Sequence, residues 1–168
     1  PLLLGCDLTK LDDFTRSLLT NDEVLETNQD ELGAQAACVA KGPRAEVWAK
    51  PMSDGSIVLA LSNTYAIPTR ITADFDSLGL AGRWRVRDLW RQKDLGTFSS
   101  QYCCDVLSHA TQLVRLFPEE GAGLRQGLGD VRDNAVYMMY VNKRPVDKPG
   151  YKAPLAPPCA ECPRNKRQ

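Results

Sequence analysis

The sequence contains no apolar run long enough to cross a bilayer, since its N-terminal run of Leu2, Leu3 and Leu4 is far shorter than the roughly 20 residues that a spanning helix needs. We therefore expect no membrane partner. Lysine and arginine number 21 and are balanced by 21 aspartates and glutamates, so the net charge is zero. A neutral chain gives no electrostatic reason to expect nucleic acid as a partner.

Residues that bind metals or crosslink small folds are also few. Six cysteines among 168 residues are too few for a disulfide-built scaffold, and they leave the redox compartment open. The single histidine, His109, follows Cys103 and Cys104, but a zinc site would need more converging ligands. Cys159 and Cys162 have the spacing of half a zinc ribbon or of a redox pair, and a metal site, a local disulfide and two ordinary thiols all stay open for them.

The remaining composition is ordinary for a globular protein, with 43% hydrophobic and 25% charged residues. It changes along the chain and divides it into three regions. Residues 1–42 have the pattern of a strand, a helix and a connector, and residues 43–118 have the pattern of an antiparallel β-sandwich. We expect residues 119–168 to be an extended, irregular Gly/Pro-rich tail with either one more strand or a short helix at 136–141, and this segment is basic from residue 141 onward.

The first region predicts the end of an α/β unit. Residues 2–4 are a continuous apolar strand, and because a buried parallel strand needs neighbours on both sides, we expect the chain to begin inside a larger fold. Thr9 or Asp12 is expected to cap the following helix. Its apolar face consists of Leu11, Phe14 and Leu18. A short second helical turn and a polar, Ala/Gly-rich connector over 28–42 complete the region.

Short strands separated by turn residues dominate the second region. Asp54 and Gly55 supply the positive-φ positions of a hairpin turn. Residues 78–82 are read as a loop. The expected strands cover 44–50, 56–63, 69–75, 83–88, 96–99, 101–107 and 110–117. Strands of this length and spacing are typical of an antiparallel β-sandwich, so the fold class is mainly β.

Three segments of the first region resemble the end of the catalytic barrel in glycoside hydrolase family 27, the α-galactosidases or melibiases. They are residues 1–9, residues 18–24 and residues 24–30, the last of which end in the motif Asn28-Gln29-Asp30. The family has proline after this motif, whereas this chain has Glu31. On this resemblance, residues 1–42 are the last strand and helix of a TIM-type (β/α)₈ barrel followed by a connector.

Three later segments, in the same order as in the family, extend the resemblance to about residue 117. Residues 46–51 and 86–96 are similar to its C-terminal β-sandwich, and residues 109–116 resemble its closing strand. The family has glycine after the histidine of this strand, whereas this chain has Ala110. The resemblance does not extend to residues 118–168.

The resemblance implies hydrolysis of terminal α-linked galactose, or of α-N-acetylgalactosamine in some members, with retention of configuration. Retention needs two carboxylates about 5 Å apart, and in the family both come from middle barrel strands. A barrel needs about 250 residues, so we expect this chain to hold no catalytic, substrate-binding or metal site and no cofactor, and to be inactive alone. Its partner would be the missing barrel portion of its own enzyme; oligomerisation and compartment stay open.

Each candidate residue has a structural interpretation beside the functional one. Asp7 lies where barrel sites are built, but a helix cap or turn explains it better. Asp12 and Asp13 suit the first turn of a helix rather than catalysis. A sugar-binding platform of Trp48, Trp84 and Trp90 would make the sandwich a free-standing carbohydrate-binding module, whereas tryptophan in a β-domain more often packs in the core. The arginines Arg83, Arg85, Arg87 and Arg91 are read as a solvated face.

Overall fold

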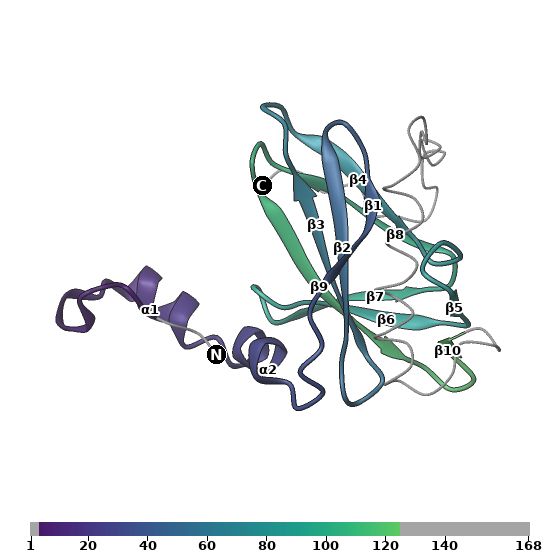
Figure 1. The fold of residues 1–168 in the computed structure, drawn as a ribbon, viewed down its shortest axis with the longest axis horizontal. Coiled ribbons are helices and arrows are strands. Elements are labelled where there is room, and N and C mark those ends of the chain that lie inside the picture. The colour runs from purple at the N-terminus through teal and green to yellow at the C-terminus, as the bar shows by residue number, and fades with distance from the viewer. Residues whose placement is uncertain (1–3, 125–168) are drawn as a thin grey trace.

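A computed structural model describes residues 4–124, in which β-structure dominates (Figure 1). The chain starts with a helical segment made of a 3₁₀ turn, Leu8–Lys10, and the helices α1 (Asp13–Leu19) and α2 (Asp22–Gln29). The strands that follow are β1 (Ala37–Lys41), β2 (Ala45–Pro51), β3 (Ile57–Asn63), β4 (Thr69–Asp74), β5 (Leu80–Ala81), β6 (Trp84–Asp88), β7 (Lys93–Phe98), β8 (Gln101–Val106), β9 (Thr111–Pro118) and β10 (Gly123–Leu124).

The strands form one large sheet and two small ones. The six-stranded sheet has the order β1-β2-β3-β9-β6-β7, and β4 pairs with β8 while β5 pairs with β10. Every pairing is antiparallel. The two small sheets pack on one face of the large sheet, which confirms the predicted β-sandwich.

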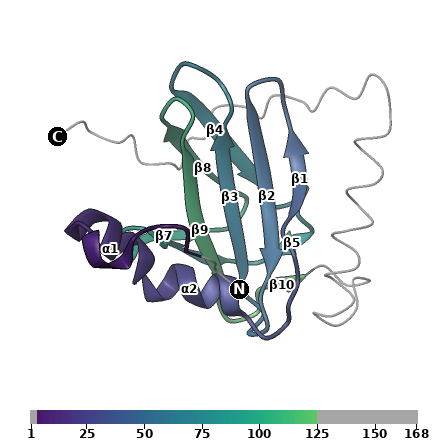
Figure 2. The same cartoon turned by 60° about the vertical axis from the view of Figure 1, so that its left-hand side comes forward.

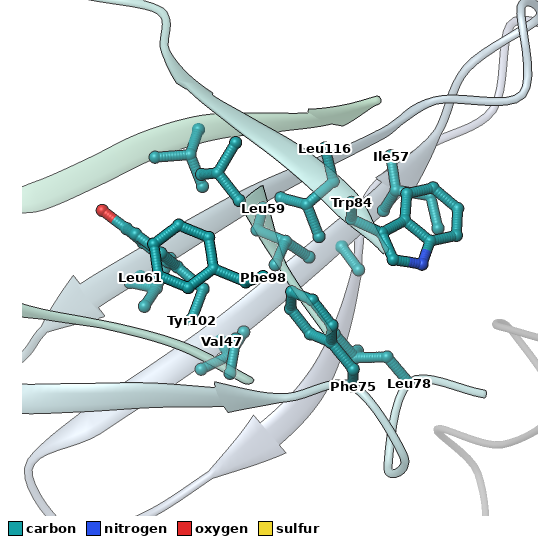
Figure 3. Close-up of a cluster of buried hydrophobic side chains, with 14 of the residues drawn as sticks. Val47, Ile57, Leu59, Leu61, Phe75, Leu78, Trp84, Phe98, Tyr102 and Leu116 are labelled. Carbon is teal, nitrogen blue, oxygen red and sulfur yellow. The ribbon is translucent and has the colours of Figure 1, made fainter. Parts of the chain in front are cut away.

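The main hydrophobic core lies between these layers (Figure 3). Trp84 is 1% exposed, and Phe75, Leu59 and Leu61 are fully buried. Strand β6 shows the alternation behind this burial, because Trp84, Val86 and Asp88 are buried while the arginines between them are half-buried. The other labelled core residues are Val47, Ile57, Leu78, Phe98, Tyr102 and Leu116.

The helical segment lies outside this core. Figure 2 shows α2 in front of one end of the large sheet, on the face away from the small sheets, while α1 projects away from the sandwich in Figure 1. Asp12 caps α1, as one of the two predicted candidates, because its Oδ1 accepts from the Thr15 amide at 2.6 Å. Asn21 caps α2, and the predicted single helical turn is a full eight-residue helix.

Four sequence predictions of local structure are wrong. The expected connector 28–42 contains strand β1, the expected loop 78–82 contains the short strand β5, and β7 begins at Lys93 rather than at residue 96. Strand β10 lies in the region expected to be irregular. Strands β1, β5 and β10 are defined by pairing with distant partners, such as Ala37 with Ala49, rather than by an apolar alternation of their own.

Some expectations lie partly or wholly outside the described residues. Leu4 is 46% exposed and belongs to no strand, and residues 1–3 of the expected apolar strand are outside the described range. The expected element at 136–141 and the pair Cys159 and Cys162 also lie outside it.

Candidate docking surface

Helix α2 and the outer face of the six-stranded sheet meet in a set of side-chain contacts, which we call the α2 junction. Asn21 begins it, with Oδ1 accepting from the Val24 amide at 3.2 Å and Nδ2 donating to the Leu89 carbonyl at 3.0 Å. Asn21 is only 8% exposed. One side chain therefore both caps the helix and fixes its start to the turn between β6 and β7.

A bidentate ion pair lies two residues further along, in the first turn of α2. The Glu23 carboxylate accepts from Nη2 of Arg87 at 2.6 Å and from its Nε at 2.9 Å. The two side chains are 21% and 26% exposed. The hydrogen bonds that Arg87 donates to Glu23 raise the pKa of Arg87 against the opposing effect of burial, and its interaction with Asp94 raises that pKa further. Two parallel bonds fix the orientation of both groups, so this pair sets the rotation of α2 on the sheet.

A buried arginine makes the third contact. Arg115 on β9 is 4% exposed and binds Oε1 of Glu26 through Nη1 at 3.0 Å. Its Nη2 lies 3.0 Å from Oδ2 of Asp54, and its Nε donates to Oγ of Ser56 at 2.7 Å. Burial alone would raise the pKa of Asp54, but the bonds from Ser56 and the charge of Arg115 outweigh it and lower that pKa. Arg115 thus links α2 to the β2–β3 turn.

Apolar and backbone contacts close the α2 junction. Met52, Val58 and Leu89 are buried in a second small core, with Val24 of α2 packed against them. Lys50 Nζ donates to the Thr27 carbonyl, near the helix end. Just after α2, the carboxylate of Asp30 accepts from both the amide and the hydroxyl of Ser53, at 3.0 and 2.7 Å. The helix is therefore fastened at its start, middle and end.

The turn at 89–92 is itself held in place by Asp88. This carboxylate is 2% exposed and accepts from the Arg91 amide at 3.0 Å and from Nε2 of Gln112 at 2.9 Å. Burial raises the pKa of Asp88, but the bonds from Gln112 and Arg91 outweigh it, so the net shift is downward. Gln92 has a φ of 51°, unusual for a side-chain-bearing residue, and donates to Oδ1 of Asp22 at 2.6 Å.

Known proteins are similar to this chain in sequence and in fold. Residues 42–116 match the family model described as the α-galactosidase C-terminal β-sandwich domain. The chain is 37% identical over 120 residues to the α-galactosidase of Cyamopsis tetragonoloba, covering 70% of this chain and 29% of that protein. The chain belongs to glycoside hydrolase family 27. It corresponds to the C-terminal portion of a family member.

Further members of family 27 agree. The probable α-galactosidase of Dictyostelium discoideum is 37% identical over 124 residues, covering 70% of this chain and 32% of that protein. Among solved structures, α-galactosidase I from Mortierella vinacea is similar with a TM-score of 0.66 at 28% identity, over 70% of this chain and 32% of that one. A family 27 β-L-arabinopyranosidase from Geobacillus stearothermophilus has a TM-score of 0.64 at 32% identity, and the match covers 70% of this chain and 26% of that one. The chain therefore spans about a third or less of the length of these relatives.

The segments that carry the family 27 resemblance converge on the α2 junction. Residues 18–24 supply Asn21 and Glu23, and the motif Asn28-Gln29-Asp30 supplies Asp30. Residues 86–96 supply Arg87 and the turn at 89–92. Arg115, which sequence reasoning passed over as an ordinary flanking residue of a strand, is a buried charged member of the α2 junction.

The aspartates considered for catalysis have structural partners. Asp7 accepts from the amide and hydroxyl of Thr9 at 3.0 and 2.7 Å, and these bonds lower its pKa. Asp12 caps α1, and bonds from Thr15 lower its pKa in the same way. Asp13 is 97% exposed and lies 3.3 Å from Nη1 of Arg16. The part of the chain that the structure describes holds no group of three potential metal ligands, and His109 is exposed.

The three tryptophans do not form one platform. Trp84 lies in the core and donates to the Ala81 carbonyl. Trp48 is half-buried, with Nε1 donating to Glu46 at 3.1 Å. Trp90, in the turn at 89–92, is 41% exposed.

The four arginines expected to form a solvated face all pair with carboxylates, and Arg83, Arg85 and Arg91 are 42–70% exposed, as expected. Arg83 pairs with Glu119, Arg85 with Asp94, Arg87 with Glu23 and Asp94, and Arg91 with Asp88. The prediction is wrong for Arg87, because α2 covers it. Over residues 4–124, no helix is long and apolar enough to cross a membrane.

Proposed function

We propose that this chain is the bracing portion of a retaining α-galactosidase, in which α2 is the last helix of the catalytic barrel and the α2 junction fixes the barrel to its C-terminal sandwich. The observation that carries the proposal is the fastening of α2 by Asn21, Glu23 and Glu26 to the sheet. These contacts join a helical segment to a complete sandwich core, and relatives with the same sandwich are named α-galactosidases.

The exposed apolar residues of the helical segment support a missing partner. Leu4, Leu8, Phe14 and Leu18 are between 38% and 71% exposed. A run of exposed apolar side chains within so short a segment is typical of a surface that another domain covers. The occupant that the family suggests is the rest of the barrel of the same enzyme.

The sandwich does not select the sugar in this account. Both an α-galactosidase and a β-L-arabinopyranosidase of the family have a similar sandwich. Barrel residues would select the substrate. The barrel would also supply the two carboxylates about 5 Å apart that retention requires.

Assay of the 168-residue chain with a chromogenic α-galactoside tests the proposal. We expect no hydrolysis above the buffer rate, because the carboxylates at the helices serve as caps and ion pairs. Hydrolysis by the chain alone, abolished by replacing one of its own aspartates, would overturn the assignment of catalysis to the barrel.

A further inference from the structure

We propose that Trp90 is the residue through which the sandwich directly contacts the catalytic barrel. This inference rests on the proposed function and deepens it, because it adds a contact surface on the sandwich to the one on the helices. Trp90 lies in the turn at 89–92, between β6 and β7. Three observations support the assignment: the rigidity of the turn, the exposure of Trp90, and the closeness of the turn to the end of α1.

The backbone on either side of Trp90 is held in place. Leu89 is 1% exposed, and its amide donates to the Leu113 carbonyl at 3.1 Å while its carbonyl accepts from Asn21. The Arg91 amide donates to Asp88, and Gln92 is kept at positive φ with its side chain on Asp22. A turn fixed on both sides presents its central side chain at little entropic cost on binding.

The indole of Trp90 is displayed by this turn rather than packed beneath it. It is 41% exposed, in contrast to Trp84 at 1%. Tryptophan is among the residues most often found at the energetic centre of an interface, since it buries a large apolar area with few rotatable bonds. An exposed tryptophan on a rigid turn is therefore typical of a contact residue.

The backbone of Trp90 lies close to the C-terminal end of α1. The Asn21 amide lies 3.5 Å from the Leu18 carbonyl, and Asn21 Nδ2 lies 3.5 Å from the Trp90 carbonyl. Leu18 and Trp90 therefore flank the same buried residue, and Phe14 lies one turn before Leu18 on α1. We call Phe14, Leu18 and Trp90 the apolar docking strip.

One occupant fits the apolar docking strip. The apolar docking strip adjoins the α2 junction at Asn21. A partner seated on the strip would therefore also touch the helices that lead into the sandwich. The chain covers 29% of its relative from Cyamopsis tetragonoloba, and the remaining length is large enough for the barrel that the family suggests. We therefore assign the strip to the barrel of the same polypeptide.

The test uses a chimera in which this chain replaces the matching segment of the Cyamopsis tetragonoloba α-galactosidase. Hydroxyl-radical footprinting with mass spectrometry compares the chimera with the free 168-residue chain. We expect labelling of Trp90 to fall several-fold in the chimera, with Leu107, which is 69% exposed in the β8–β9 turn, labelled equally in both. Trp84 should stay unlabelled in both and so reports folding.

Equal labelling of Trp90 in both proteins would overturn the inference. If the same chimera hydrolyses α-galactosides, the proposed function would still stand. A folded chimera that lacks activity would instead count against the proposed function, and Trp90 labelling would still decide the contact. As a second measurement, Trp90→Ala should shorten the half-life of heat inactivation of the chimera about tenfold. Trp90→Phe should restore most of the half-life, and Leu107→Ala should have the half-life of the parent chimera. A Trp90→Ala half-life equal to that of Leu107→Ala would contradict the assignment.

Discussion

Nη1 of Arg115 on strand β9 lies 3.0 Å from Oε1 of Glu26 on helix α2, which joins a central strand of the large sheet to the helix outside it. The two groups differ in their surroundings, since the arginine side chain is 4% exposed and the glutamate 60%. The arginine therefore depends on all its acceptors, Glu26, Asp54 and Ser56, whereas the glutamate has water as an alternative.

This asymmetry predicts different costs for the two partners. Replacing Arg115→Met should lower the free energy of unfolding by about 2–3 kcal/mol, because the buried Ser56 loses its donor and the half-exposed Asp54 loses its ion pair. Glu26→Gln should cost less than about 1 kcal/mol, since the carboxylate is largely exposed. Urea denaturation of both variants measures this difference, and equal costs would show that Arg115 does not organise the contact.

The pair of Glu23 and Arg87 predicts that lysine cannot replace arginine. Arg87→Lys should cost about 1–2 kcal/mol, because a single ammonium cannot make both bonds to the carboxylate. The matched control is Arg85→Lys on the same strand. Arg85 binds Asp94 with both side chains more than 40% exposed, so its replacement should cost less than about 0.5 kcal/mol. Equal urea midpoints for the two variants would contradict the role of the bidentate pair.

The lowered pKa of Asp88 predicts a loss of stability in acid. A carboxylate whose pKa is lower in the folded than in the unfolded state stabilises the fold fully above its unfolded pKa of about 3.9, and this contribution is lost as the pH falls through the lower folded value. Asp88→Asn should be less stable than the parent near neutral pH, and the gap should narrow below about pH 4. Urea denaturation across this range checks the sign; a gap that widens in acid would contradict it.

Two glycines with similar backbone angles predict different costs for alanine. Gly82 has a φ of 81°, and a Cβ there would lie 2.7 Å from Cα of Ala122. Gly55 has a φ of 83° with open space around the same position. We expect Gly55→Ala to cost about 1 kcal/mol from backbone strain alone, and Gly82→Ala to cost at least about 1 kcal/mol more because the backbone must shift. Thermal denaturation separates them, and equal melting temperatures would show that the 119–122 turn moves freely.

The sequence predicted the elements whose signals are local. Strand β3 is a continuous apolar run after an Asp-Gly turn, and β6 alternates between Trp84, Val86 and the arginines. Asp12 was a cap candidate for the same reason, since capping is a contact within four residues. Strand β1 was missed because its residues carry no alternation and are organised by pairing with β2.

The α2 junction could not be predicted residue by residue. Glu23 and Arg87 lie far apart in the sequence, and charge alone does not show which arginine of β6 faces a helix and which faces water. Arg115 looked like any charged residue beside a buried strand, because its burial comes from α2 and the β2–β3 turn rather than from its own neighbours. The family resemblance marked the right segments without showing that they meet.

The activity of the chimera tests the central claim most directly. Turnover of a chromogenic α-galactoside is compared between the Cyamopsis tetragonoloba enzyme truncated before its matching segment and the chimera that carries this chain in that place. We expect the truncated enzyme to be inactive or to lose its activity quickly, and this chain alone to be inactive. We expect the chimera to hydrolyse the substrate with a stability that Arg115→Met lowers. A truncated enzyme as active and as heat-stable as the chimera would contradict a bracing role for this chain.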